Sequence, residues 1–421
     1  MGTRTYMNVV DNSMARPMIK AHKSVRLHFD VPLLLVTVTL MIFGMLMVYS
    51  ASWDFSFTNN GSATYVLRRQ FAFMGVGCLA VLFFAWLDYH YWRKLAVPAM
   101  AVAVLGLITV LLVGDMRNGA VRTVFNGSIQ PSELAKIVIV IYLAVWLNAK
   151  REQLSNVNFG LIPLGIILGF IGGLIYKQPD ISAVLTIMLL GGLMFFLAGG
   201  ELRQILIILL LGFLVGWIVV QSGGARGTGA ARWESFTSGL KDPLQASYHV
   251  RRSLEAFAKG GVFGVGIGKA TTKLTGLPVP HTDSVFAVVG EETGFIGSFF
   301  LIGMYALLLW RGLVVAQRAA DRLGRLLAAG LTLWLVIEAY INMAVMVGLI
   351  PFAGNALPFI SVGGSNLLVS MAAVGILLNV SRLSEKTAEE EERTFNEVVD
   401  LRWRDRRRRV PRSRRTRNVQ R

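Results

Sequence analysis

Five ionisable residues stand at the edges of long apolar segments, where a charge is costly unless it is paired or hydrated. They are Arg69, Glu133, Lys136, Asp180 and Asp283. Each lies near the N-terminal end of an apolar segment, where free backbone N–H groups and the positive end of a helix dipole collect. Such positions suit a phosphate or pyrophosphate group. The five residues therefore predict a site for an anionic substrate at one end of a helical bundle.

Each of these residues also has a purely structural interpretation. Glu133 and Lys136 are spaced i, i+3, so they could neutralise each other on one helix face. Gln178-Pro179-Asp180 could form a corner in which the aspartate caps the following helix. Asp283 follows Pro278 and Pro280 and could be a helix cap as well. The residue types alone leave both interpretations open.

Two further features of the sequence lie close to these residues. Glu291 and Glu292 fall inside an apolar segment and predict either a buried network or an ion path. The glycine-rich run 259–269 does not fit a phosphate-binding loop, because Phe263 replaces a required glycine and Ala270 the Ser/Thr. We expect its glycines to allow close packing or a flexible turn over the site.

The elements that position these residues are apolar segments of about 17–25 residues, the length that a helix needs to cross a bilayer. We predict an all-α polytopic membrane protein whose first segment is an uncleaved signal anchor. The ten predicted spans cover residues 31–50, 70–87, 95–113, 134–148, 159–176, 181–198, 203–221, 285–310, 325–349 and 366–381. The composition agrees, because 54% of the 421 residues are hydrophobic and 16% charged, against about 45–50% and 25% in soluble domains.

The distribution of Lys and Arg predicts the orientation, because these residues are enriched in short cytoplasmic loops. With the N-terminus inside, the inner segments hold 28 Lys and Arg and the short outer segments 5. Both termini are then cytoplasmic, and the long segment 222–284 is an extracytoplasmic loop between helices 7 and 8. Within it, residues 247–258 predict an amphipathic helix lying in the headgroup plane, with Val250, Leu254, Phe257 and Ala258 on its apolar face.

The net charge of +17 is best interpreted by where the charged residues lie along the chain. We predict three regions: a cytoplasmic tail at 1–30, a transmembrane domain at 31–382, and a charged, disordered cytoplasmic tail at 383–421. The second tail is expected to contact anionic lipids or a cytoplasmic partner. Because most cations adjoin the inner ends of apolar spans, the charge does not indicate a nucleic-acid partner. The single cysteine, Cys78, excludes a disulfide framework.

Several short motifs occur along the chain in a fixed order. They are Arg69-Gln70, Gln130-Pro131-Ser132-Glu133 with Lys136, Gln178-Pro179-Asp180, the 259–268 run, Pro280-His281-Thr282-Asp283, Glu291-Glu292-x-Gly294 and Pro358-Phe359-Ile360-Ser361-x-Gly363-Gly364-Ser365. With these motifs and ten spans, the chain resembles the FtsW/RodA/SpoVE (SEDS) family of peptidoglycan polymerases over most of residues 31–382. The long charged tails favour an FtsW-like over a RodA-like member.

The resemblance implies a glycosyltransferase that polymerises lipid II at the outer face of the bacterial cytoplasmic membrane, with Asp283 as general base. It implies Glu133 and Lys136 as an intramembrane acid and base pair. The substrate-binding residues that it implies are Arg69, Gln130, Asp180, Lys259, His281 and Ser361. It establishes no cofactor and leaves a divalent cation, Mg²⁺ or Mn²⁺, open. The implied partners are lipid II, a class B penicillin-binding protein, other divisome or elongasome membrane proteins, and membrane lipids.

The sequence departs from the family in three places, which keeps two other functions open. Thr123 stands where members usually have a tryptophan, Ile181-Ser182-Ala183 follows Asp180, and Ser284 follows Asp283. A lipid II flippase would use the intramembrane charges as a path between leaflets. A non-catalytic scaffold that activates the penicillin-binding protein would explain the missing tryptophan.

Overall fold

The computed structural model describes residues 29–113, 115–117, 120–123, 130–201, 203, 204, 206, 207, 210 and 228–408. Within these residues the protein is a bundle of helices with one short antiparallel hairpin, which pairs β1 (Asp115–Arg117) with β2 (Ala120–Thr123). The first half of the chain contains α1 (Val31–Asn60), α2 (Tyr65–Trp86), α3 (Trp92–Val113), α4 (Pro131–Ala149), α5 (Ile162–Tyr176) and α6 (Ile181–Leu197). The second half contains α8 (Thr228–Lys241), α9 (Tyr248–Gly260), α10 (Val285–Arg318), α11 (Arg322–Met346) and α12 (Gly364–Arg408). Short helical turns lie at η1 (Tyr89–Tyr91), η2 (Arg151–Gln153), η3 (Val157–Leu161) and η4 (Pro243–Gln245).

The predicted apolar spans correspond closely to these helices. Eight described helices are long and apolar enough to cross a membrane, and α6 is a shorter apolar helix of 17 residues. Together they match nine of the ten predicted spans. The remaining one, 203–221, lies almost entirely outside the described residues. The protein is therefore an α-helical integral membrane protein.

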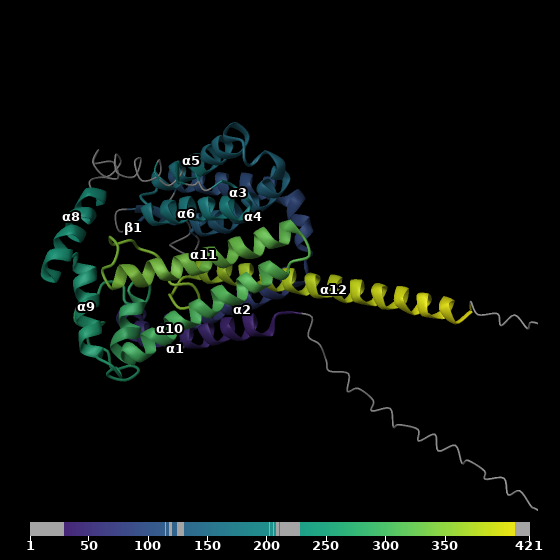
Figure 1. The fold of residues 1–421 in the computed structure, drawn as a ribbon. Coiled ribbons are helices and arrows are strands. Elements are labelled where there is room, and N and C mark those ends of the chain that lie inside the picture. The colour runs from purple at the N-terminus through teal and green to yellow at the C-terminus, as the bar shows by residue number, and fades with distance from the viewer. Residues whose placement is uncertain are drawn as a thin grey trace, which may run out of the picture.

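The helices differ in how much of their surface is covered by the rest of the bundle. In their most apolar windows, 67% of α4, 78% of α11 and 83% of α12 is buried, against 11% of α2 and 22% of the span that contains α3. The pairs α2 with α12, α10 with α11, and α3 with α4 make the largest contacts (Figure 1). The central helices α4, α11 and α12 thus form the frame in which charged side chains can be held away from lipid.

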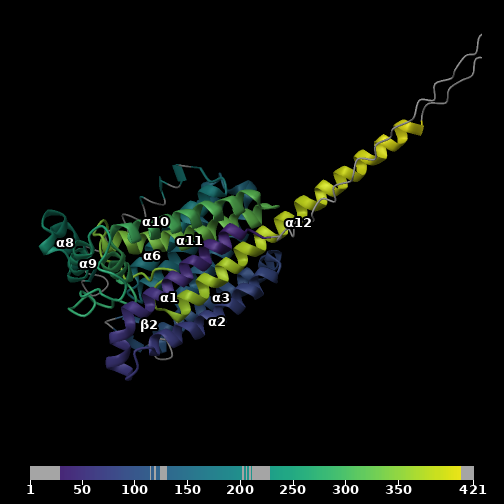
Figure 2. The same cartoon turned by 90° about the horizontal axis from the view of Figure 1, so that it is seen from below.

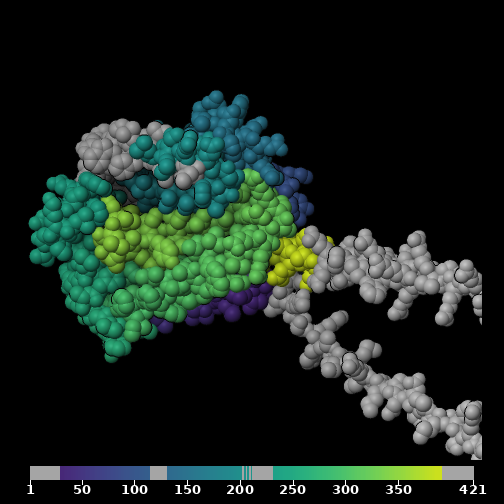
Figure 3. Space-filling view, viewed as in Figure 1, coloured from purple at the N-terminus to yellow at the C-terminus, as the bar shows by residue number. Residues whose placement is uncertain are grey.

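One end of the bundle carries the β1–β2 hairpin and the loops that precede α10 and α12, and we call it the loop end (Figure 1). α8 and α9 cover this end in the space-filling view (Figure 3). The opposite end is tied by ion pairs, in which Arg311 contacts Asp30 at 2.5 Å and Arg93 contacts Asp321 at 2.9 Å. Asp30 also caps α1 by accepting a hydrogen bond from Leu33 N at 2.8 Å. The two ends are therefore fastened by different groups.

α10 is broken near the loop end. Gly294 has φ 68° and ψ −164°, which divides the helix into two segments. The glycine-rich loop packs directly against this break, where Val265 N and Gly266 N donate to the carbonyls of Glu291 and Glu292, both at 3.0 Å. A Cβ added at Gly264 would lie 2.2 Å from Glu292 O. The expectation that these glycines allow close packing is confirmed.

The structure changes two expectations about the flanking elements. The amphipathic helix exists as α9, where Val250 is buried and Leu254 and Phe257 are half-buried as predicted, but Ala258 is exposed and Ser253 and Ala256 are buried instead. The face is rotated because α9 packs against α10 and α11. In addition, α12 continues as one helix to Arg408 and projects from the bundle (Figure 2), where we predicted a disordered tail from 383. The Glu and Arg residues that suggested disorder are also good helix formers.

Candidate active site

The centre of the site is a cluster of three buried ionic side chains. Lys136 Nζ lies 2.9 Å from Glu133 Oε1 and also donates to Glu338 Oε1. Only 5% of the Lys136 side chain is exposed, with 9% for Glu133 and 2% for Glu338. The predicted Glu133–Lys136 contact is confirmed, and the cluster has a third member from α11. We call these three residues the ionic triad.

α12 holds the triad from a third direction. Asn366 Nδ2 donates to Glu133 Oε2 at 2.9 Å. One residue earlier, Ser365 Oγ accepts from Gln130 N at 3.1 Å, and the Gln130 side chain donates to Ser132 Oγ at 3.0 Å. The two polar motifs at the N-terminal ends of α4 and α12 are therefore in direct contact, although 235 residues separate them.

Asp283 lies in the loop that leads into α10, beside the segment that precedes α12. Its backbone carbonyl accepts a hydrogen bond from Asn342 Nδ2 at 2.8 Å, and the same amide donates to Asn355 O at 2.5 Å. A Cβ added at Gly354 would lie 2.8 Å from Asp283 Oδ2. The absence of a side chain at Gly354 leaves space for the Asp283 carboxylate. Together with the Asn342 hydrogen bonds, this contact places the Asp283 segment between α11 and the 353–355 turn.

Ser361 holds the same loop from the other side. Its hydroxyl donates to Thr282 O at 2.7 Å and accepts from Leu357 N at 2.8 Å, and it is buried. Val362 N donates to His281 O at 2.8 Å. Gln70 of α2 also holds this segment, because its side-chain amide donates to Ser361 O at 3.3 Å and accepts from Gly363 N at 3.4 Å. Both Ser361 contacts go to backbone groups, so its predicted contact with substrate stays a prediction.

His281 is buried next to Asp283 and packs on Phe55 of α1 with ring centroids 4.5 Å apart. Its Nδ1 has no hydrogen-bond partner among the described atoms. Burial lowers the pKa of His281 from 6.5 to about 4, because the imidazolium form would lose its hydration. The ring is therefore neutral at physiological pH.

The other predicted binding residues lie in different surroundings. Asp180 caps α6 by accepting from Ala183 N at 3.3 Å, and Ser182 Oγ donates to it at 2.9 Å, as the structural interpretation expected. Lys259 pairs with Glu255 at 2.9 Å on the exposed side of α9. Arg69 is exposed on α2, with its guanidinium 5.7 Å from the Phe73 ring centroid. The structure does not bring these three residues into the ionic triad.

Glu291 and Glu292 form the buried network that we predicted as one of two alternatives. The Glu291 carboxylate accepts from the backbone N–H groups of Thr271 and Thr272 at 2.8 and 3.2 Å. Glu292 pairs with Lys273 at 2.7 Å and accepts from Ser50 Oγ at 2.5 Å. These contacts fasten the loop that leads to Asp283 onto α10 and α1.

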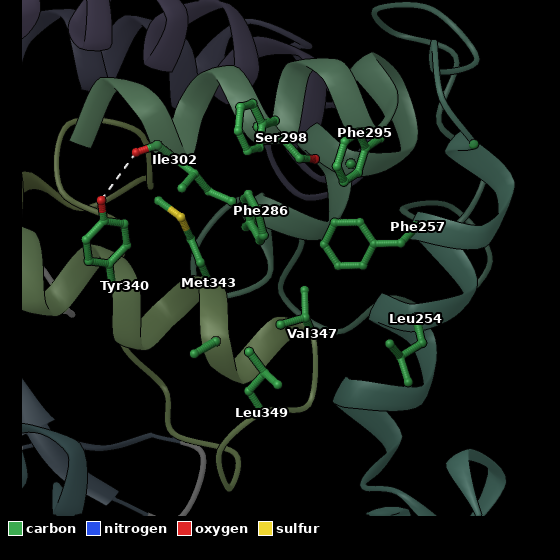
Figure 4. Close-up of a pocket in the computed structure, with 14 residues that line it drawn as sticks. Leu254, Phe257, Phe286, Phe295, Ser298, Ile302, Tyr340, Met343, Val347 and Leu349 are labelled. Atoms are coloured by element: carbon green, nitrogen blue, oxygen red, sulfur yellow. Dashed lines mark hydrogen bonds between the residues drawn. The ribbon is translucent and has the colours of Figure 1, made fainter. Parts of the chain in front are cut away.

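An apolar cavity of about 550 Å³ lies between α9, α10 and α11. Phe257 of α9, Phe286 and Phe295 of α10, and Met343 of α11 line it, and Tyr340 donates to Ile302 O at 3.4 Å along its edge (Figure 4). The cavity contains almost no polar surface, so it suits an apolar chain or an apolar side of a helix.

Sequence reasoning missed three polar residues of the site. Glu338 is an ionisable residue within a predicted span, so the rule that selected Glu133 could have found it. Asn342 and Asn366 are uncharged, and only their contacts reveal them. Among the described residues, no group of three or more His, Cys, Asp and Glu side chains is arranged to hold a metal ion. A divalent cation therefore stays a prediction.

Comparison with known proteins gives consistent results. The FtsW/RodA/SpoVE family model, described as "Cell cycle protein", matches residues 31–386. "Probable peptidoglycan glycosyltransferase FtsW" of Trichlorobacter lovleyi is 40% identical over 361 residues, covering 84% of this chain and 93% of that protein. "Stage V sporulation protein E" of Bacillus subtilis is 36% identical over 365 residues, covering 84% of this chain and 97% of that protein.

Solved structures extend the similarity to the fold. A chain from "Structural coordination of polymerization and crosslinking by a peptidoglycan synthase complex" aligns with a TM-score of 0.70 and 26% identity, over 85% of this chain and 99% of that chain. The rod shape determining protein RodA of Thermus thermophilus aligns with a TM-score of 0.63 and 26% identity, over 85% and 98%.

Proposed function

The chain belongs to the FtsW/RodA/SpoVE family, and on this premise we propose that it is a peptidoglycan glycosyltransferase that polymerises lipid II into glycan strands. The observation that carries the proposal is the Asp283 carboxylate, which lies against Gly354 in a loop held by Asn342 and Ser361. A carboxylate held in this way can serve as a general base, because it is positioned before the substrate arrives.

In the proposed reaction, Asp283 accepts the proton of the acceptor GlcNAc 4-hydroxyl as that oxygen attacks the anomeric carbon of the donor. The bond from the anomeric carbon to the undecaprenyl pyrophosphate breaks, and the pyrophosphate leaves with the electron pair. Its growing negative charge requires a cation. Lys136 is the proposed source within the bundle, and Arg69 the proposed source on the exposed side of α2.

We infer that the loop end faces outward. The excess of Lys and Arg in the segments assigned to the opposite side supports this orientation, with 28 such residues against 5 in the short outer segments. Lipid II that has already crossed the membrane would then reach Asp283 without further transport. Labelling of a single cysteine introduced at an exposed loop-end position such as Lys241, in a Cys78→Ser background, by a membrane-impermeant reagent in intact cells tests the orientation.

We propose a class B penicillin-binding protein as the partner, supported by the similarity to a chain of a solved peptidoglycan synthase complex. The apolar cavity offers a surface for its transmembrane helix, because Phe295 and Phe299 at this edge of α10 are 66% and 64% exposed. Changing both to alanine should reduce co-purification of the partner. The matched control changes Leu112 and Val113 of α3, which are 79% and 71% exposed.

Purified protein with this transpeptidase should convert lipid II into polymer that a muramidase digests. Failure to form polymer, together with movement of labelled lipid II across vesicle membranes, would favour the flippase alternative. Failure in both assays, with stimulation of the transpeptidase, would favour the scaffold. We propose an FtsW-like role in division, for which depletion should give filaments rather than round cells.

A further inference from the structure

The ionic triad contains one carboxylate more than it needs for neutrality. Glu133 alone balances the charge of Lys136, and the two residues are one helical turn apart on α4. Glu338 brings a second carboxylate from α11 into a place where only 2% of its side chain is exposed. Burying an extra charge costs free energy, so neutralising Lys136 does not explain why Glu338 is there.

α11 contacts both halves of the proposed site from one face. Glu338 and Asn342 are spaced i, i+4, which places their side chains on the same side of the helix, one turn of 5.4 Å apart. Glu338 accepts from Lys136 Nζ, and Asn342 donates to the Asp283 carbonyl at 2.8 Å. Two adjacent turns of α11 therefore contact both the proposed cation, Lys136, and the segment of the proposed base, Asp283.

α11 is suited to this role because it is held on several sides. It is among the most deeply buried helices of the described bundle, and it packs on α4, α6, α10 and α12. α4 and the loop before α10 are far apart in sequence, and Glu338 and Lys136 are separated by 202 residues. A shared rigid helix is a direct way to keep their spacing constant.

We propose that Glu338 is a positioning residue for the polymerase reaction, fixing the Lys136 ammonium at a set distance from Asp283 through α11. The proposal rests on the proposed function. Lys136 is held by both carboxylates, and Glu133 also accepts a hydrogen bond from Asn366, so Glu338 is the only member of the triad that ties the ammonium to α11. Reactions between bound groups are sensitive to displacements of about 1 Å, which can reduce a rate by about 100-fold.

The test is a kinetic comparison of Glu338→Gln and Glu338→Asp with wild type, using purified protein and its transpeptidase partner on lipid II. Glutamine keeps the shape but loses the charge, so Lys136 loses its ionic contact with α11 and keeps the one with Glu133. We expect kcat to fall at least tenfold, with KM within about twofold and the melting temperature unchanged. Aspartate keeps the charge and should recover part of kcat. Thr332→Val, a near-isosteric change in the buried part of α11, should leave all three values unchanged.

Two results would overturn the proposal. One is a wild-type kcat in Glu338→Gln. The other is a loss of kcat accompanied by an equal loss of folded protein in both Glu338 variants, which would indicate a structural role. Neither result affects the proposed function, provided that wild type polymerises lipid II. Failure of wild type itself to polymerise would instead overturn the proposed function.

Discussion

Removing different members of the ionic triad should change the free energy of unfolding by different amounts, which can be measured. Lys136→Met removes the ammonium but keeps a side chain of similar length. Glu133 and Glu338 then remain as two carboxylates around one site, with 9% and 2% of their side chains exposed. Breaking a buried pair by removing one partner costs roughly 3–5 kcal/mol, because a buried charge is left uncompensated. Glu338→Gln leaves Lys136 paired with Glu133, so we expect a change within about 1 kcal/mol.

The measurement is the free energy of unfolding of each purified variant, obtained by titrating protein in mild detergent micelles with a denaturing detergent. The double variant Lys136→Met with Glu338→Gln should recover part of the lost stability, since one uncompensated carboxylate is gone. Equal stability of Lys136→Met and Glu338→Gln would refute the reasoning. A larger loss in Glu338→Gln than in Lys136→Met would refute it as well.

Two further predictions follow from single residues of the loop end. Burial lowers the pKa of His281 from 6.5 to about 4, so between these pH values the unfolded chain binds more protons than the folded chain. The free energy of unfolding is therefore unaffected by His281 above pH 6.5 and falls by up to about 3 kcal/mol as the pH is lowered toward 4. His281→Gln should flatten this part of the pH dependence of unfolding, and an unchanged slope would contradict the assignment. Gly264→Ala should lose at least about 2 kcal/mol of stability, since φ is +80° and the added Cβ would lie 2.2 Å from Glu292 O. Gly303→Ala, a helical position with open space around it, is the matched control and should change stability by less than about 1 kcal/mol.

Local patterns in the sequence predicted the local structure well. The spacing of Glu133 and Lys136 predicted their contact, and Pro179-Asp180 predicted the cap of α6, because both depend on residues within one turn. The apolar runs predicted nine described helices, because the length of such a run is also a local property of the sequence. The glycine-rich loop also behaved as expected, since its packing follows from the lack of side chains.

Contacts between distant segments could not be predicted in this way. Nothing in the spacing of Glu338 indicates that it meets Lys136, because the contact depends on how α11 packs against α4. Asn342 and Asn366 are single amides in apolar segments, and no pattern distinguishes them from other polar residues. The buried face of α9 was displaced for a related reason, since its neighbours are α10 and α11 rather than a lipid surface alone. Charge composition predicted disorder after residue 383, whereas the strong helix propensity of the same residues agrees with the continuation of α12.

The most direct test of the central claim is lipid II polymerisation by Asp283→Asn, measured beside wild type and Asp242→Asn with the same transpeptidase partner. Asparagine keeps the size of the side chain and removes the base. Asp242 lies in a partly exposed turn before α9, where it caps η4 by accepting from Leu244 N at 2.9 Å, so its change serves as the matched control. We predict no polymer from Asp283→Asn, at wild-type levels of folded protein and partner binding, and full activity from Asp242→Asn. Polymer formed by Asp283→Asn at the wild-type rate would contradict the role of Asp283 as the base.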